Sequence, residues 1–153
     1  MSNVQDNKAI VSRWREEFWG RNYDPRIVDE LAASYMLFNH SLHTPRVGRE
    51  PIKAFMAGFR ESFPDLRFEG SSDLIADGDL VVSRWVGEGT HTGPAFYDLR
   101  KGALPEASGR KIRFTGMSVF RLEDGKIVEE TGLDDGVTAL QQLGFVRTPV
   151  WPA

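Results

Sequence analysis

The chain contains no cysteine and no long apolar run, and both absences exclude classes of protein. Without cysteine among its 153 residues there is no disulfide framework, no thiolate nucleophile and no thiolate metal site. No segment is long and apolar enough to span a bilayer, and residues 1–18 lack the apolar core of a signal peptide. We therefore expect a cytoplasmic protein that does not enter a membrane.

Positive charge and phosphate-binding motifs are also scarce. The formal net charge at pH 7 is -3 and no basic run stands out, which argues against nucleic acid or an anionic membrane as a partner. The sequence has no glycine-rich phosphate loop and no serine-centred nucleophile elbow. It also lacks the His-x-His and His-Glu-x-x-His spacings of metal sites, so we expect no bound metal.

Three helical patterns occupy the first part of the chain. Apolar residues recur at helical spacing over 7–22, 26–33 and 51–63, with charged residues between them. A proline stands at or next to the start of the second and third patterns, where its missing N–H is not needed. We expect each of these segments to bury one face against the rest of the domain.

Strand-like alternation begins at Leu66 and contains two hairpin signals. Asp77-Gly78 and Asp124-Gly125 each lie between alternating runs, and residues 93–109 between the two hairpins form a loop rich in Gly, Pro and Ala. Helices gathered first and antiparallel strands gathered later favour an α+β fold. We expect three helices packed on one face of a curved, mainly antiparallel sheet, which makes a cone with an open mouth.

Two long strands joined at Asp124-Gly125 organise the chain. A two-residue turn there places Phe120 opposite Glu129 and Phe114 near Asp135. One mostly apolar face then carries Phe114, Gly116, Ser118, Phe120, Leu122, Ile127, Thr131, Leu133 and Asp135. An Asp aimed into an apolar concavity has a raised proton affinity, so Asp135 is our candidate catalytic acid/base.

Asp135 and the second catalytic candidate, His91, each have a structural alternative. Asp is a favoured helix N-cap, and a β-bulge in the hairpin would reverse the parity and turn Asp135 outward. His91 ends a strand beside a glycine-rich loop, where it either donates to a substrate carbonyl or is hydrogen-bonded within the rim. The candidates for the substrate pocket are Tyr35, His40, Phe59, Trp85, Phe114, Ser118, Phe120 and Thr131.

Eight short segments follow one another in a recognisable order along the chain. They are Asn39-His40, Phe63-Pro64-Asp65-Leu66, residues 76–82, residues 89–93, Ser108-Gly109-Arg110-Lys111, Val119-Phe120-Arg121, residues 124–130, and Asp135 followed by Gln142-Leu143-Gly144. This order and spacing resemble the SnoaL-like polyketide cyclases, a family of ester cyclases in the superfamily of nuclear transport factor 2 (NTF2) and ketosteroid isomerase. The resemblance covers about 8–146 of one expected domain, 1–153, and leaves 147–153 as a tail. It implies a cone-shaped α+β barrel of the NTF2-like, or cystatin-like, type.

The resemblance also implies a reaction. Members of the family close a ring in a polyketide methyl ester by an intramolecular aldol reaction, with no metal and no organic cofactor. Their acid/base is an Asp shortly before the closing motif, and counting back from Gln142-Leu143-Gly144 gives Asp135, with Asp134 one residue away. Two departures alter the pocket: Thr131 stands where the family usually has Trp, and the loop 93–109 is longer.

Two other functions remain open at this point. The altered Thr131 and loop 93–109 suit a non-catalytic carrier or sensor of a small apolar molecule. The fold also supports an isomerase or epoxide hydrolase, which a second buried carboxylate, or a Tyr opposite Asp135, would favour.

The opposite face of the hairpin is half apolar and needs a cover. Its residues in the expected register are Thr115, Met117, Val119, Val128 and Gly132. By analogy with the family, we expect a homodimer that forms through this outer sheet face.

Overall fold

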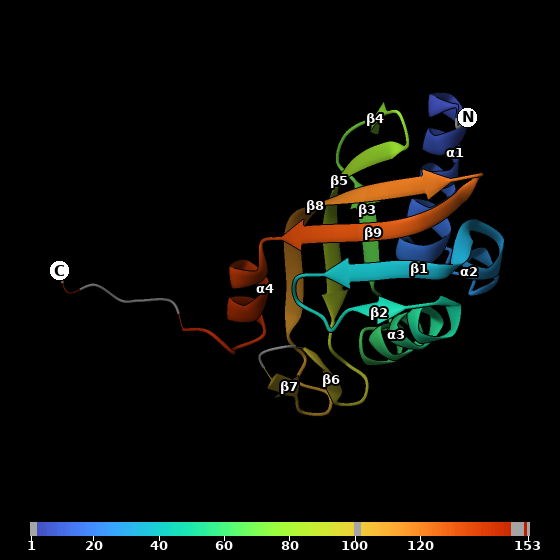
Figure 1. The fold of residues 1–153 in the computed structure, drawn as a ribbon. Helices are drawn as coiled ribbons and strands as arrows, with labels where there is room; N and C mark the ends of the chain where they lie inside the picture. The colour runs from blue at the N-terminus through green and yellow to red at the C-terminus, as the bar shows by residue number, and fades with distance from the viewer. Residues whose placement is uncertain (1–2, 100–101, 148–151, 153) are drawn as a thin grey trace.

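The computed structural model describes residues 3–99, 102–147 and 152, so most of the expected tail 147–153 lies outside the described part (Figure 1). The helical segments are α1 (Val4–Trp14), the π-helix η1 (Arg15–Trp19), α2 (Arg26–Leu31), α3 (Arg49–Ser62) and α4 (Gly136–Gln142). The strands are β1 (Ala32–His40), β2 (Arg46–Val47), β3 (Arg67–Gly70), β4 (Ile75–Asp77), β5 (Leu80–Thr90), β6 (Phe96–Leu99), β7 (Gly102–Leu104), β8 (Lys111–Glu123) and β9 (Lys126–Asp134).

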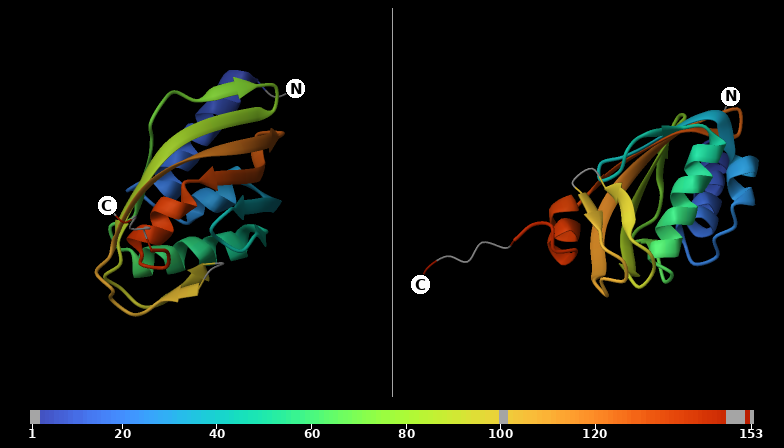
Figure 2. Two further views of the ribbon diagram at one scale, coloured as in Figure 1. Left: turned by 90° about the vertical axis from the view of Figure 1, so that its left-hand side faces the viewer. Right: turned by 90° about the horizontal axis from the view of Figure 1, so that it is seen from below.

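Seven strands form one curved sheet, with α1, α2 and α3 gathered on one side of it (Figure 2). The order is β2-β1-β9-β8-β5-β3, with β4 paired to β5; β1 and β9 are parallel and the other pairs are antiparallel. The expected α+β fold is therefore confirmed. The sheet is not closed: among the described residues β2 forms one edge, and β3 and β4 form the other.

Apolar faces of the helices cover the concave side of the sheet. In α3, Ile52, Phe55, Met56 and Phe59 are buried at helical spacing, as the sequence pattern indicates. None of the described helices has the length and apolar composition needed to cross a bilayer. The core that results is rich in aromatic rings, many of which meet edge to face.

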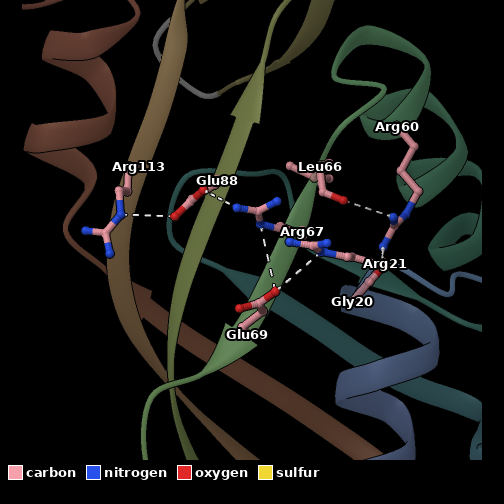
Figure 3. Close-up of polar contacts among 8 residues, drawn as sticks. All are labelled: Gly20, Arg21, Arg60, Leu66, Arg67, Glu69, Glu88 and Arg113. Atoms are coloured by element: carbon pink, nitrogen blue, oxygen red, sulfur yellow. Dashed lines mark hydrogen bonds and ion pairs between the residues drawn. The ribbon is translucent and has the colours of Figure 1, made fainter.

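Arg60 fastens the last turns of α3 to two neighbouring segments (Figure 3). Its guanidinium donates to the carbonyl oxygens of Phe18 at 2.6 Å, Gly20 at 2.9 Å and Leu66 at 3.2 Å. Burial lowers the pKa of Arg60 to about 10, which still leaves it charged at neutral pH. The bonds hold η1 and the start of β3 against α3, and so help to fix one side of the interior.

A β-bulge at Val128 changes the register of the β8–β9 hairpin. Next to the turn Leu122 pairs with Ile127, as in a regular two-residue hairpin, but Arg121 then pairs with Glu129. Ile127 and Val128 are both buried, so one extra residue is accommodated in β9. Beyond the bulge each residue of β9 lies on the opposite face from the one that a regular hairpin would give it.

The bulge corrects the expected inner face of β9. The residues that face inward are Glu130, Gly132 and Asp134. The prediction that Thr131, Leu133 and Asp135 share this face is wrong; Leu133 is 72% exposed. Strand β8 keeps the expected parity, because the extra residue lies in its partner.

The outer face of the sheet carries paired charges at one end and exposed apolar residues near the centre. Glu88 on β5 accepts from Arg67 on β3 at 2.8 Å and from Arg113 on β8 at 3.0 Å, which links three strands (Figure 3). Met117 and Leu133 are exposed and lie directly opposite each other on β8 and β9. Of the residues expected on this face, Thr115, Met117 and Val119 are exposed, whereas Val128 and Gly132 are buried.

Candidate active site

A cavity lies between the concave face of the sheet and the N-terminal helical segments. Its lining is Arg15, Trp19, His40, His43, Phe59, Phe68, Ser83, Trp85, Phe114, Ser118, Phe120, Glu130 and Asp134. The unfilled space is about 450 Å³ when the opening to solvent is included. The part open to the centre of a water molecule is only about 20 Å³, which is room for a single water.

The π-helix η1 supplies two polar side chains to this cavity. It continues α1 directly, and its wider turn brings both Arg15 and Trp19 to the lining. Short π-helical turns within α-helices occur frequently at functional sites. The sequence pattern over 7–22 predicts one regular helix with Trp14 and Phe18 buried. Both residues are buried, but the helix is π-helical from Arg15 and ends at Trp19, and the pattern gives no sign that Trp19 also faces inward.

Four glycines on the concave face allow large side chains to lie flat across neighbouring strands. Arg15 lies over Gly70, Phe68 over Gly87, Trp85 over Gly116 and His40 over Gly132. A Cβ atom at any of these glycines would overlap the side chain above it. These glycines therefore help to shape the cavity.

Glu130 is a buried carboxylate in the cavity wall. It is 0% exposed, and its Oε1 accepts a hydrogen bond from Trp19 Nε1 at 2.7 Å. Its Oε2 lies 3.5 Å from His40 Nε2, and neither of these two atoms has a hydrogen-bond partner. A regular hairpin would turn Glu130 outward, and the bulge turns it inward.

Asp134 is the second carboxylate of the cavity. Ser41 Oγ donates to its Oδ1 at 3.0 Å. Burial raises the pKa of Asp134 above its ordinary value, although the hydrogen bond from Ser41 and the nearby His40 and His43 act in the opposite direction. A carboxyl group with a raised pKa in an aromatic cavity is suited to both accepting and returning a proton.

His43 is contacted by the segment 93–109, which the sequence predicts to be a long loop. Part of 93–109 forms β6 and β7, and Asp98 on β6 approaches His43 Nδ1 through its carbonyl oxygen at 2.7 Å and its Oδ2 at 3.2 Å. Arg46 Nη2 donates to Asp98 Oδ1 at 2.6 Å. Burial opposes ionisation of Asp98, but His43 and Arg46 together keep its pKa below the ordinary value.

The candidate acid/base Asp135 does not lie in the cavity. It is exposed, and it caps α4 by accepting from the backbone N–H of Thr138 at 3.2 Å and from its hydroxyl at 2.5 Å. These bonds lower the pKa of Asp135. The bulge at Val128 turns Asp135 outward, so its expected position facing the pocket is corrected, and Asp134 takes the place expected for it.

His91 is buried outside the cavity. Its Nε2 is 2.7 Å from the carbonyl oxygen of Pro94, and its Nδ1 is 2.7 Å from Ser108 Oγ and 3.3 Å from Ser108 N. A neutral ring that donates through Nε2 and accepts through Nδ1 satisfies all three contacts. His91 is therefore hydrogen-bonded within the rim, at the base of the 93–109 segment, and does not face the cavity.

The other expected pocket residues divide into two groups. Six line the cavity: His40, Phe59, Trp85, Phe114, Ser118 and Phe120. Tyr35 is 60% exposed and bonded to Glu123, and Thr131 is on the outer face, where its hydroxyl donates to Glu129. Six further lining residues were not expected from the sequence, namely Arg15, Trp19, His43, Phe68, Ser83 and Glu130, whereas Asp134 was the alternative to Asp135.

One local signal in the sequence indicates the bulge that turns Glu130 and Asp134 inward. Ile127 and Val128 are consecutive apolar residues, separated from the turn only by Lys126, and they interrupt the alternation of a regular strand. Such a pair is what a bulge with both side chains buried would require. Within the described residues, no group of three or more His, Cys, Asp or Glu side chains is arranged to hold a metal ion.

Comparison with known proteins agrees with this fold. A solved structure of a candidate SnoaL-like polyketide cyclase from Jannaschia sp. CCS1 is 22% identical, with a TM-score of 0.78, and the match covers 97% of this chain and 98% of that one. IdmH from Streptomyces antibioticus, a candidate polyketide cyclase, is 27% identical with a TM-score of 0.69, over 90% of this chain and 98% of that one. A protein with a ketosteroid isomerase-like fold from Catenulispora acidiphila, solved with trimethylamine, is 18% identical with a TM-score of 0.69, over 92% and 97%.

The family assignment follows from the sequence itself. No curated protein gives a significant match. The sequence profile of SnoaL-like polyketide cyclases, however, matches residues 9–143, which is most of the chain. The chain therefore belongs to the SnoaL-like polyketide cyclase family.

Proposed function

We propose that this protein catalyses a cofactor-free, aldol-type ring closure on a small polyketide-like substrate, with Asp134 as the acid/base. The observation that carries the proposal is a partly buried carboxyl group of raised pKa in an aromatic cavity of a chain from this family. Asp134 replaces Asp135 in this role, because Asp135 caps a helix outside the cavity.

The proposed reaction needs one base and several donors. Asp134 removes a proton from a carbon next to a carbonyl, and the enolate attacks a second carbonyl of the same molecule. The resulting alkoxide takes the proton back from Asp134, so that atoms and charge balance. Arg15 lines the same cavity and supplies donors for the oxygen on which charge develops.

The size of the cavity limits the substrate. Since the interior has room for about one water, a bound ligand requires side chains of the lining to move. Phe59 and Trp85 are bulky aromatic side chains of the lining, and displacing them would open space. For Trp85 this requires breaking its hydrogen bond to Ser118 Oγ. We therefore expect small activated substrates, such as esters with a 1,3-dicarbonyl group, to react before large polycyclic ones.

The experiment that tests this function is turnover of a panel of polyketide methyl esters and simpler 1,3-dicarbonyl compounds, followed by chromatography. Asp134→Asn should lower the rate by about 100-fold or more, because the base is removed while the shape is kept. Asp135→Asn is the matched control and should leave the rate almost unchanged. Full activity of Asp134→Asn, or an equal loss in Asp135→Asn, would overturn the assignment. Binding without turnover in wild type and variants would instead favour a carrier.

A second candidate function is favoured by one observation, the buried carboxylate of Glu130. Two carboxylates in one cavity suit an isomerase, which moves a proton between two carbons, or a hydrolase, which activates a water. Product analysis of the same panel separates these reactions. A shifted double bond or an added water, in place of a closed ring, would assign the chain to this second class.

We also propose that the protein forms a homodimer through the outer sheet face and is located in the cytoplasm. The exposed Met117, Val119 and Leu133 support the interface, since they form an apolar group on the neighbouring strands β8 and β9. Sedimentation velocity should show a dimer in the wild type and a monomer in Leu133→Glu. A wild-type monomer at high concentration would contradict the proposed interface.

A further inference from the structure

Two polar atoms in the fully buried part of the cavity wall face each other at 3.5 Å without forming a hydrogen bond. Glu130 Oε2 and His40 Nε2 belong to side chains that are at most 5% exposed, and neither atom makes a hydrogen bond. Buried polar atoms are almost always satisfied, because leaving one unpaired costs free energy. Both atoms line the same cavity, so the missing partner would enter from there.

The rest of each side chain is fixed. Trp19 Nε1 donates to Glu130 Oε1 at 2.7 Å, which holds the carboxylate with its second oxygen toward His40. The His40 ring lies directly over the backbone of Gly132 and in edge contact with the Trp19 ring, with 5.1 Å between the ring centroids. The two unpartnered atoms are therefore held at a fixed separation.

That separation selects a single small group. The atoms are 3.5 Å apart, so one oxygen atom can lie within hydrogen-bond distance of both. The carboxylate only accepts, and His40 Nε2 donates when it carries the ring proton. A hydroxyl satisfies both, whereas a carbonyl cannot donate to Glu130 and an ammonium cannot accept from His40. The free space of about 20 Å³ fits one such oxygen.

We propose that Glu130 and His40 form a hydroxyl-binding subsite, which takes the enol or phenol oxygen of a flat substrate and holds a water in its place when no substrate is bound. The aromatic walls, which include Phe68, Trp85 and Phe114, suit a flat ring attached to that hydroxyl. This inference rests on the proposed function for the identity of the natural substrate. The subsite itself is tested by binding alone.

The probes are phenol and toluene, which share size and shape and differ in the hydroxyl. Calorimetry and NMR titration of the wild type should give phenol an affinity at least about tenfold higher than toluene, as expected for a hydrogen bond to a charged group. Glu130→Gln should abolish this preference, because its amide still accepts from Trp19 but no longer presents an acceptor to the hydroxyl. Glu129→Gln, one residue away on the outer face, is the matched control and should keep it.

A second variant and a crystal structure test the subsite independently of Glu130→Gln. If Glu130→Gln does not fold, His40→Phe, which removes the donor, should likewise lose the preference for phenol. A crystal structure with phenol should place its oxygen within hydrogen-bond distance of Glu130 Oε2 and His40 Nε2. Equal affinities for phenol and toluene, no saturable phenol binding, a preference that survives Glu130→Gln, or a fixed water that phenol does not displace would each overturn the subsite. Phenol preference without turnover of the ester panel would overturn the proposed enzyme and leave the subsite standing.

Discussion

Strand β9 and the residue after it carry two pairs of neighbouring acidic residues, Glu129-Glu130 and Asp134-Asp135. In each pair one side chain faces the cavity and the other faces outward. Glu130 and Asp134 face the cavity, whereas Glu129 and Asp135 face outward. On the outer side the carboxylates are fully engaged: Glu129 accepts from Thr131 at 3.0 Å, and Asp135 caps α4. On the inner side Glu130 keeps one oxygen without a partner, and burial raises the pKa of Asp134.

The comparison shows that residue type alone does not decide which carboxylate is suited to chemistry. Asp134 and Asp135 are neighbours, yet their pKa values move in opposite directions, because burial acts on one and two hydrogen bonds from Thr138 act on the other. A single extra residue, Val128, sets which of them faces the cavity. Substitutions on the cavity side of β9 and on its outer side therefore have different expected effects.

The largest effect is expected from Trp19→Phe, which removes the hydrogen bond from Trp19 Nε1 to the buried Glu130 Oε1. The free energy of unfolding, measured with urea, should fall by about 3 kcal/mol, since a fully buried carboxyl group loses its donor. In a Glu130→Gln background the same substitution should cost clearly less, because the carboxyl group that the bond served is absent. Equal costs in the two backgrounds would show that the bond to Glu130 contributes little and that the loss comes from packing.

A smaller effect is expected from Gly132→Ala on the inner face. The added Cβ would overlap the His40 ring, so the ring must shift, at a cost of about 2 kcal/mol in stability. The shift should also weaken any phenol binding, because it moves His40 Nε2 away from Glu130. Gly58→Ala is the matched control: it lies in α3 with nothing within 4 Å of the added atom, and should stabilise by up to about 1 kcal/mol. Two variants of equal stability would contradict the close packing of His40 on Gly132.

The sequence was sufficient for the local elements because their signals are local. The helical spacing over 51–63 corresponds to α3, and Asp124-Gly125 forms the expected turn, with positive φ at both residues, 48° and 76°. The short apolar run before His40 proved to be the end of β1, which is parallel to β9. That pairing joins segments about 90 residues apart, and the alternation of residues within one strand does not indicate which other strand it pairs with.

The site could be predicted only in part, and for two physical reasons. Residues on β8 kept their expected parity, so Phe114, Ser118 and Phe120 were placed correctly in the lining. Residues on β9 were placed on the wrong face, because β9 contains a bulge. The cost of the bulge is offset by the burial of both Ile127 and Val128, which depends on tertiary packing. The approach of Trp19 to Glu130 likewise joins residues 111 positions apart and depends on a π-helical turn that no local pattern indicated.

The smallest effect concerns how stability changes with pH in Asp134→Asn and Asp135→Asn. Because the folded pKa of Asp134 is raised above its ordinary 3.8, its favourable contribution is complete below that value and is lost as pH rises through the folded pKa. Asp134→Asn should therefore gain stability relative to wild type between acid and neutral pH.

The folded pKa of Asp135 is lowered, so its contribution is present above 3.8 and is lost as pH falls through the folded pKa. Asp135→Asn should thus lose stability relative to wild type over the same rise in pH. Urea unfolding at a series of pH values measures both differences, and slopes of the same sign would contradict the opposite environments of these two neighbours.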